Sequence, residues 1–111
     1  MTSFPPPSTE DIQRVVDLVV EVAKPLRVVL FGSAARGNAR DGSDLDLMVV
    51  VSEGVDENQV AKDLYIAMAR RKVSIGVDLL VATPSRFDAS TQSLGSVFRD
   101  IARDSREIYA A

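Results

Sequence analysis

Three aspartates stand in apolar segments at a spacing that favours one shared carboxylate site. Asp44 and Asp46 are separated by a single residue and lead directly into the apolar run 47–51. Because side chains alternate between the two faces of a strand, both carboxylates point to the same face, about 7 Å apart at Cα. Asp78 lies within a second apolar segment, residues 73–82. If the two segments are neighbouring strands, as sequential strands usually are, all three carboxylates line one patch.

The composition restricts the chemistry that such a patch can perform. The chain contains neither His nor Cys, which excludes a zinc site built on imidazole or sulfur, a thiolate nucleophile and a Ser-His-Asp triad. A metal must therefore sit on oxygen ligands, which favours Mg²⁺ or Mn²⁺. Three carboxylates are the ligand set expected of a two-metal site, where cations bridge phosphate oxygens during an in-line displacement. The general base must be a carboxylate, a Lys, a Tyr or water.

A Gly-Ser pair ends the apolar run that precedes the first two aspartates. Gly32 and Ser33 follow residues 26–31 and open a turn-rich connection. A strand that ends in Gly-Ser and turns into a short helix exposes backbone N–H groups and a hydroxyl, which together hold an anion such as a triphosphate. Arg36 lies one turn later and could neutralise phosphate charge. The pattern is neither a P-loop nor a GxGxxG motif.

Each of these features, taken alone, also has a simpler explanation. A Gly-Ser pair is commonly a turn, and Asp-x-Asp commonly begins a strand on a solvated face. Arg36, taken alone, could be a charged residue of a solvent-exposed loop. Asp78, taken alone, could be an acidic residue on the exposed side of a strand. The combination of spacing, strand context and a third acid favours the site over these alternatives. Tyr65 and Tyr109 are interpreted as amphipathic packing residues rather than catalysts.

Helices and strands are expected to alternate along the chain. Ser8 predicts the N-cap of a helix that ends before Pro25, and Asp56 predicts the N-cap of a second helix reaching about Arg71. Strands are expected at residues 26–31, 44–51 and 73–82, a helical turn from Thr83-Pro84, a last helix around 97–102 and a short edge strand at 107–109. This order predicts an α/β (α+β) fold with a mixed β-sheet flanked by helices.

Length and charge indicate one domain without a membrane segment. We expect residues 1–7, which include three successive prolines, to form a flexible lead-in and residues 8–111 to form a single domain. The N-terminus lacks the pattern of a signal peptide, and the apolar run 12–23 carries three charges, so a cytoplasmic location is expected. The net charge of −3 provides no global basic field, so direct nucleic-acid binding is not expected.

The separated Gly-Ser and Asp-x-Asp elements resemble the signature of a known superfamily. Gly32-Ser33, followed after ten residues by Asp44-Leu45-Asp46, is similar to the signature of the DNA polymerase β-type nucleotidyltransferases. The inner sequences "GSAARG" and "SDLDL" resemble the minimal nucleotidyltransferases, the MNT or MntA-like proteins. The resemblance implies the polymerase β-type nucleotidyltransferase fold, ATP as substrate and two Mg²⁺ ions, with Mn²⁺ as a possible replacement.

The resemblance also implies roles for individual residues. Ser33 would contact the nucleotide phosphates, and the residue pattern described above assigns Gly32 and Arg36 to the same phosphate-binding group. Asp44 and Asp46 would ligate the metals. Asp78 would be the third carboxylate, ligating one metal and helping to activate the acceptor hydroxyl.

Relatives of this kind often pair with a HEPN-domain partner, an RNase toxin, and neutralise it. Some do so by transferring AMP to a tyrosine of that partner. The resemblance therefore implies an ATP-binding protein adenylyltransferase that acts as the antitoxin of a toxin–antitoxin system, alone or within a homo- or hetero-oligomer. Two alternatives stay open: a non-catalytic antitoxin that masks the HEPN toxin by contact, and a nucleotidyltransferase acting on a small molecule. The 111 residues leave little chain to grip a second substrate, which favours a partner that presents its own hydroxyl.

Overall fold

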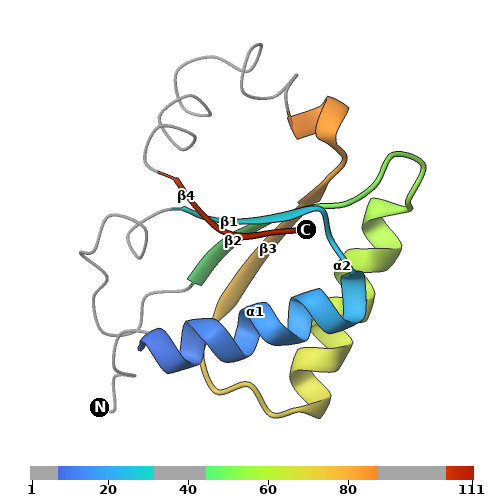
Figure 1. The fold of residues 1–111 in the computed structure, drawn as a ribbon. Helices are drawn as coiled ribbons and strands as arrows, with labels where there is room; N and C mark the ends of the chain where they lie inside the picture. Colours follow the sequence, from blue (N-terminus) through green and yellow to red (C-terminus); the bar gives the residue numbers. More distant parts are fainter. Residues whose placement is uncertain (1–7, 32–44, 88–104) are drawn as a thin grey trace.

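The helices and strands follow one another in the order α1, β1, β2, α2, β3, β4 (Figure 1). The structure is a computed structural model, and it describes residues 8–31, 45–87 and 105–111. Within these ranges the elements are α1 (Thr9–Ala23), β1 (Arg27–Phe31), β2 (Leu45–Val50), α2 (Glu57–Arg70), β3 (Val77–Ala82) and β4 (Arg106–Ala110). Residues 84–87 add a helical turn directly after β3.

The described strands form one mixed sheet in the order β3-β2-β1-β4. β1 pairs antiparallel with β2 on one side and with β4 on the other. β2 and β3 are parallel, and α2 lies in the crossover that such a pair requires. The predicted fold class, a mixed sheet with helices packed on it, is confirmed. The expected neighbourhood of the second and third strands is also confirmed.

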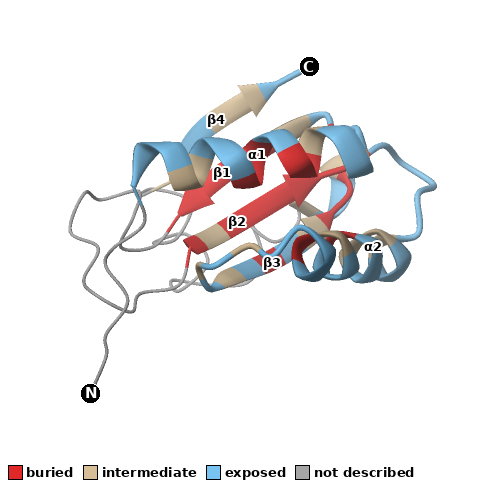
Figure 2. Cartoon of the chain, turned by 90° about the horizontal axis from the view of Figure 1, so that it is seen from below, coloured by how far each residue is buried: buried red, intermediate tan, exposed pale blue. Residues whose placement is uncertain are grey.

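One face of the sheet carries the main hydrophobic core, and α1 and α2 both pack on it (Figure 2). Leu45, Leu47 and Val49 of β2 point into this core, as the alternation along that strand predicted. The other buried members come from both helices and from β1, β3 and the residue after β2: Val15, Leu18, Val19, Val28, Leu30, Val51, Leu64, Met68 and Leu79. The alternate residues of β2, including Asp46, therefore point to the opposite face.

Both predicted helix starts are confirmed at the level of individual hydrogen bonds. Ser8 Oγ accepts the N–H of Asp11 at 3.1 Å, and the Asp11 carboxylate accepts the N–H of Ser8 at 3.1 Å, which completes a capping box. The Asp56 carboxylate accepts the N–H of Gln59 at 3.2 Å at the start of α2. These caps fix the residues at which the two helices begin.

The third strand is shorter than the alternation of its residues predicted. The expected strand covered residues 73–82, but β3 begins at Val77, which pairs with Leu45, the first residue of β2. Val73 packs against the core, so its apolar character reflects burial in the connection from α2 rather than strand pairing. The expected edge strand at 107–109 is confirmed within β4. The helix expected around 97–102 and the lead-in 1–7 lie outside the described residues.

Candidate functional site

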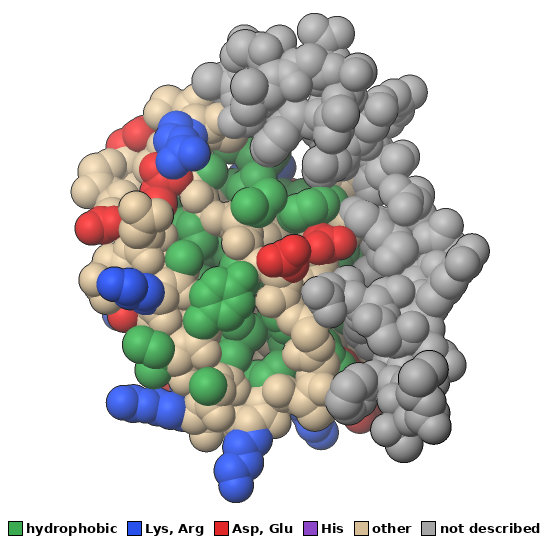
Figure 3. Space-filling model, turned by 180° about the vertical axis from the view of Figure 1, so that it is seen from behind, with side chains coloured by type: hydrophobic (Ala, Val, Ile, Leu, Met, Phe, Trp, Pro, Cys, Tyr) green, Lys and Arg blue, Asp and Glu red, His purple; other side chains and the backbone are tan. Residues whose placement is uncertain are grey.

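Asp46 and Asp78 occupy paired positions on adjacent strands. The parallel register of β2 and β3 aligns Asp46 with Asp78, so the two Cα atoms are separated by about one strand spacing, roughly 5 Å. Paired residues of neighbouring strands project to the same side of a sheet, here the face opposite α1 and α2. Asp46 is half-buried and Asp78 is exposed. Figure 3, which views the molecule from behind Figure 1, shows acidic side chains near the middle of that surface with hydrophobic side chains around them.

Buried apolar side chains, here called the apolar floor, lie beside the two acids on the second face of the sheet, the one opposite α1 and α2. Its buried members are Val29, Phe31, Met48, Val50 and Ala82, and the ring of Phe87 packs against them. Leu80 is the next residue of β3 that projects to the same face as Asp78, and it is 45% exposed. The two carboxylates therefore form a polar group bordered by apolar side chains, an arrangement that is common in small-molecule sites.

The other predicted site residues lie outside the described part of the chain. They are Gly32, Ser33, Arg36 and Asp44. The residue that precedes Gly32, Phe31, is paired in register with Asp46 across β1 and β2. The strand that leads into the Gly-Ser pair therefore ends beside one of the two acids.

The donor set available at this place fits a hard divalent cation. Asp46 and Asp78 supply carboxylate oxygens from neighbouring strands, and the chain has no imidazole or thiolate to favour zinc. Within residues 8–31, 45–87 and 105–111 there is no cluster of three or more metal-ligating side chains. The third predicted ligand, Asp44, would have to complete the set.

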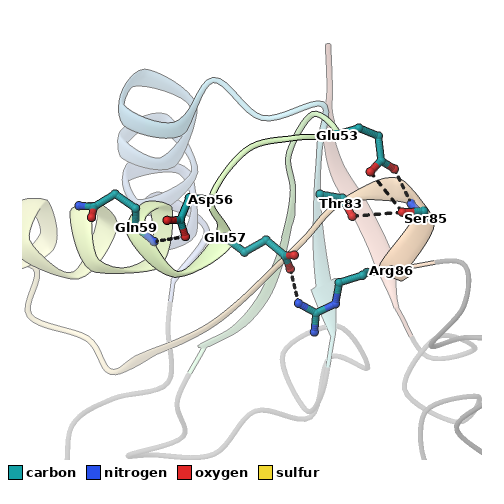
Figure 4. A network of polar contacts seen from close by, with 7 residues as sticks. All are labelled: Glu53, Asp56, Glu57, Gln59, Thr83, Ser85 and Arg86. Carbon is teal, nitrogen blue, oxygen red and sulfur yellow. Dashed lines mark hydrogen bonds and ion pairs between the residues drawn. The ribbon is translucent and has the colours of Figure 1, made fainter.

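A polar network that the sequence did not reveal joins the segment after β2 to the helical turn after β3 (Figure 4). The Glu53 carboxylate accepts the N–H of Ser85 at 2.9 Å and its hydroxyl at 3.2 Å. Arg86 donates to the Glu57 carboxylate at 2.7 Å. The hydrogen bond from the Ser85 backbone, followed by that from its hydroxyl, holds the pKa of Glu53 below its usual value. The helix start at Thr83-Pro84 was predicted, but its capping carboxylate lies far away in the sequence.

Phe87 is held over the second face by a basic side chain. The Arg27 guanidinium carbon lies 5.3 Å from the centroid of the Phe87 ring, within the range of a cation–π contact. Arg27 also forms an ion pair with Glu107 of β4. No sequence motif marked Arg27 or Phe87, because their contact depends on how the chain leaves β3.

A cavity of about 340 Å³ lies elsewhere, between α1 and the connection from α2 to β3. Arg14 and Leu18 of α1 line one side, and Lys72 and Val73 line the other. Neither Asp46 nor Asp78 borders it, because it lies on the helix side of the sheet. No helix in the described ranges is long and apolar enough to cross a membrane.

Comparison with known proteins identifies relatives of this fold. The family model of the nucleotidyltransferase domain matches residues 12–108. Comparison with curated proteins gave no match. Among solved structures, a proposed nucleotidyltransferase from Sulfolobus solfataricus is similar with a TM-score of 0.55 and 21% identity, covering 91% of this chain and 78% of that one. A second proposed nucleotidyltransferase has a TM-score of 0.57 and 15% identity, covering 88% and 97%. A toxin–antitoxin structure with AMP-PNP has a TM-score of 0.54 and 18% identity, covering 89% and 73%.

Proposed function

The chain belongs to the nucleotidyltransferase domain family, and we propose that it transfers AMP from ATP to a hydroxyl group in a Mg²⁺-dependent reaction. The observation that carries the proposal is the pairing of Asp46 with Asp78 on the face of the sheet opposite α1 and α2. Two carboxylates from adjacent strands can share a divalent cation, and the strand ending in the Gly-Ser pair lies next to one of them.

In this proposal the chain supplies ligands and orientation. Asp44, Asp46 and Asp78 hold the cations, and Gly32, Ser33 and Arg36 bind the triphosphate. Cations held there would neutralise charge on the triphosphate and on the leaving pyrophosphate.

The transfer itself is an in-line displacement at the α-phosphorus of ATP. The acceptor oxygen forms a new bond to the α-phosphorus, and the bond from that phosphorus to its bridging oxygen breaks, which releases pyrophosphate. The acceptor proton passes to Asp78 or to water.

The proposed acceptor is a tyrosine hydroxyl of a HEPN-domain toxin, which makes this protein the antitoxin of a toxin–antitoxin pair. The toxin–antitoxin structure with AMP-PNP, one of the structural neighbours, supports this context.

The test is to incubate the protein with ATP, Mg²⁺ and the product of the adjacent gene, and to measure the intact mass of that product. We expect a mass gain of one AMP group that disappears when Mg²⁺ is chelated. An unchanged mass with both proteins folded and bound to each other would rule out the proposed transfer.

A second candidate is an antitoxin that masks its toxin by contact alone. The exposed Leu80 beside Asp78 favours it, because an apolar side chain on an accessible face is suited to a protein partner. Replacing both Asp44 and Asp46 with Ala separates the two candidates. Loss of neutralisation supports transfer, whereas neutralisation at the original level supports masking by contact.

A further inference from the structure

The hydroxyl of Tyr65 connects α2 to the outer edge of β3. Tyr65 Oη accepts the backbone N–H of Leu79 at 3.0 Å, in a partly buried position. β3 is an edge strand in the described sheet, with β2 on its inner side. The residue before Tyr65 in α2, Leu64, is fully buried in the core, so the helix delivers the phenol from a fixed place.

The backbone of β3 divides its hydrogen-bonding groups between two directions. Leu45 donates to the carbonyl of Gly76 at 2.8 Å, and Val51 donates to the carbonyl of Ala82 at 2.9 Å. Because this pattern repeats every two residues in a parallel pair, the carbonyl of Asp78 is directed toward β2. The N–H of Leu79 points the other way, to Tyr65. The peptide unit between Asp78 and Leu79 is therefore held from β2 on one side and from α2 on the other.

We propose that Tyr65 is a positioning residue for Asp78. By holding the outer end of the Asp78–Leu79 peptide unit, its hydroxyl fixes the direction in which the Asp78 side chain leaves the strand. An edge strand has a neighbour on one side only, so without this contact the peptide unit is held from β2 alone and can tilt about the strand axis. This role rests on the proposed function, since it matters only if Asp78 ligates a cation together with Asp46.

The substitution Y65F removes the hydroxyl and keeps the ring. The matched control is Y109F, which makes the same change on β4, at the opposite edge of the sheet. The ring of Tyr109 packs against the same core, and its hydroxyl makes no hydrogen bond within the part of the chain that the structure describes. Any effect specific to Y65F therefore reports the contact with Leu79.

Three measurements on the full chain test the proposal. Amide exchange followed by NMR should speed up at Leu79 in Y65F and stay unchanged in Y109F. The affinity for Mn²⁺, titrated by electron paramagnetic resonance, should fall roughly three- to tenfold in Y65F, as expected for loss of one hydrogen bond. The Mg²⁺ concentration for half-maximal transfer should rise by a similar factor, while kcat at saturating Mg²⁺ stays within about twofold of the unsubstituted protein.

The outcomes distinguish a positioning role of Tyr65 from simple shielding of the β3 backbone. They also distinguish failure of this proposal from failure of the proposed function. Faster exchange at Leu79 with Mn²⁺ affinity equal to that of Y109F would show that Tyr65 only shields the edge, which overturns the proposal. Unchanged exchange at Leu79 would overturn it as well. Failure of the unsubstituted protein to bind Mn²⁺ would refute the metal site and the role of Tyr65 together. Mn²⁺ binding that weakens in Y65F, without any transfer by the unsubstituted protein, would refute the proposed function alone.

Discussion

Asp46 on β2 and Asp78 on β3 are register partners in a parallel strand pair, on the face of the sheet that α1 and α2 leave open. They are 32 positions apart in the sequence, since 78 − 46 = 32. Pairing of the two strands brings like charges to adjacent positions beside an apolar floor, an arrangement that a divalent cation stabilises.

The neutral substitution D78N tests the pair most directly. Asn keeps the shape of the side chain but removes a charge that would ligate the cation and accept the acceptor proton, so transfer should slow by roughly 10²–10⁴-fold. Because Asp78 is exposed, the free energy of unfolding should change by less than about 0.5 kcal/mol. D17N is the control, since Asp17 lies on α1 and accepts only from Gln13 among its described contacts. A rate for D78N equal to that of D17N would argue against a role for Asp78.

Acid should weaken the polar network around Glu53. Hydrogen bonds from Ser85 lower the pKa of the Glu53 carboxyl below the reference value of 4.5. A carboxyl group whose pKa is lower in the folded state than in the unfolded state stabilises the fold at pH values above its unfolded-state pKa. This contribution disappears as the pH falls through the folded-state pKa. The melting temperature of E53Q should therefore lie below that of the unsubstituted protein at neutral pH, and the two should converge in acid. A gap that stays constant into strong acid would contradict this account.

Truncation of two leucines on neighbouring strands should affect stability to very different extents. Leu47 is fully buried, so L47A should lower the free energy of unfolding by about 2–5 kcal/mol through lost contacts and the cavity left behind. Leu80 is 45% exposed, so L80A should change it by less than about 0.5 kcal/mol. Urea denaturation of the two variants checks both values. If Leu80 belongs to a surface for the protein partner, L80A should also weaken binding to that partner, which calorimetry would detect.

The capping box at the start of α1 should contribute measurably to stability. S8A removes the oxygen that accepts the Asp11 N–H, so it should lower the free energy of unfolding by about 1 kcal/mol. T9A is the control, because no hydrogen bond of the Thr9 side chain is found among the described contacts. Equal denaturation midpoints for S8A and T9A would show that the cap is not stabilising.

Features that depend on a few consecutive residues were predicted well from the sequence. Ser8 and Asp56 cap their helices as expected, because a cap involves residues only three positions apart. The alternation along β2 correctly separated core residues from Asp46. The start of β3 was placed four residues too early, since apolar alternation reports burial and does not report where a partner strand begins. The roles of Gly32, Ser33, Arg36 and Asp44 stay predictions.

The candidate site itself combines local and distant information. The sequence alone shows that carboxylates are present and that His and Cys are absent. It also contains the Gly-Ser and Asp-x-Asp elements, whose spacing indicates a nucleotidyltransferase. The parallel register that aligns Asp46 with Asp78 came only with the folded sheet. The same is true of the phenol of Tyr65 on Leu79 and of the Glu53 carboxylate on Ser85. Such contacts follow from strand order and helix packing, in which residues distant along the chain meet, so no local pattern of residue types encodes them.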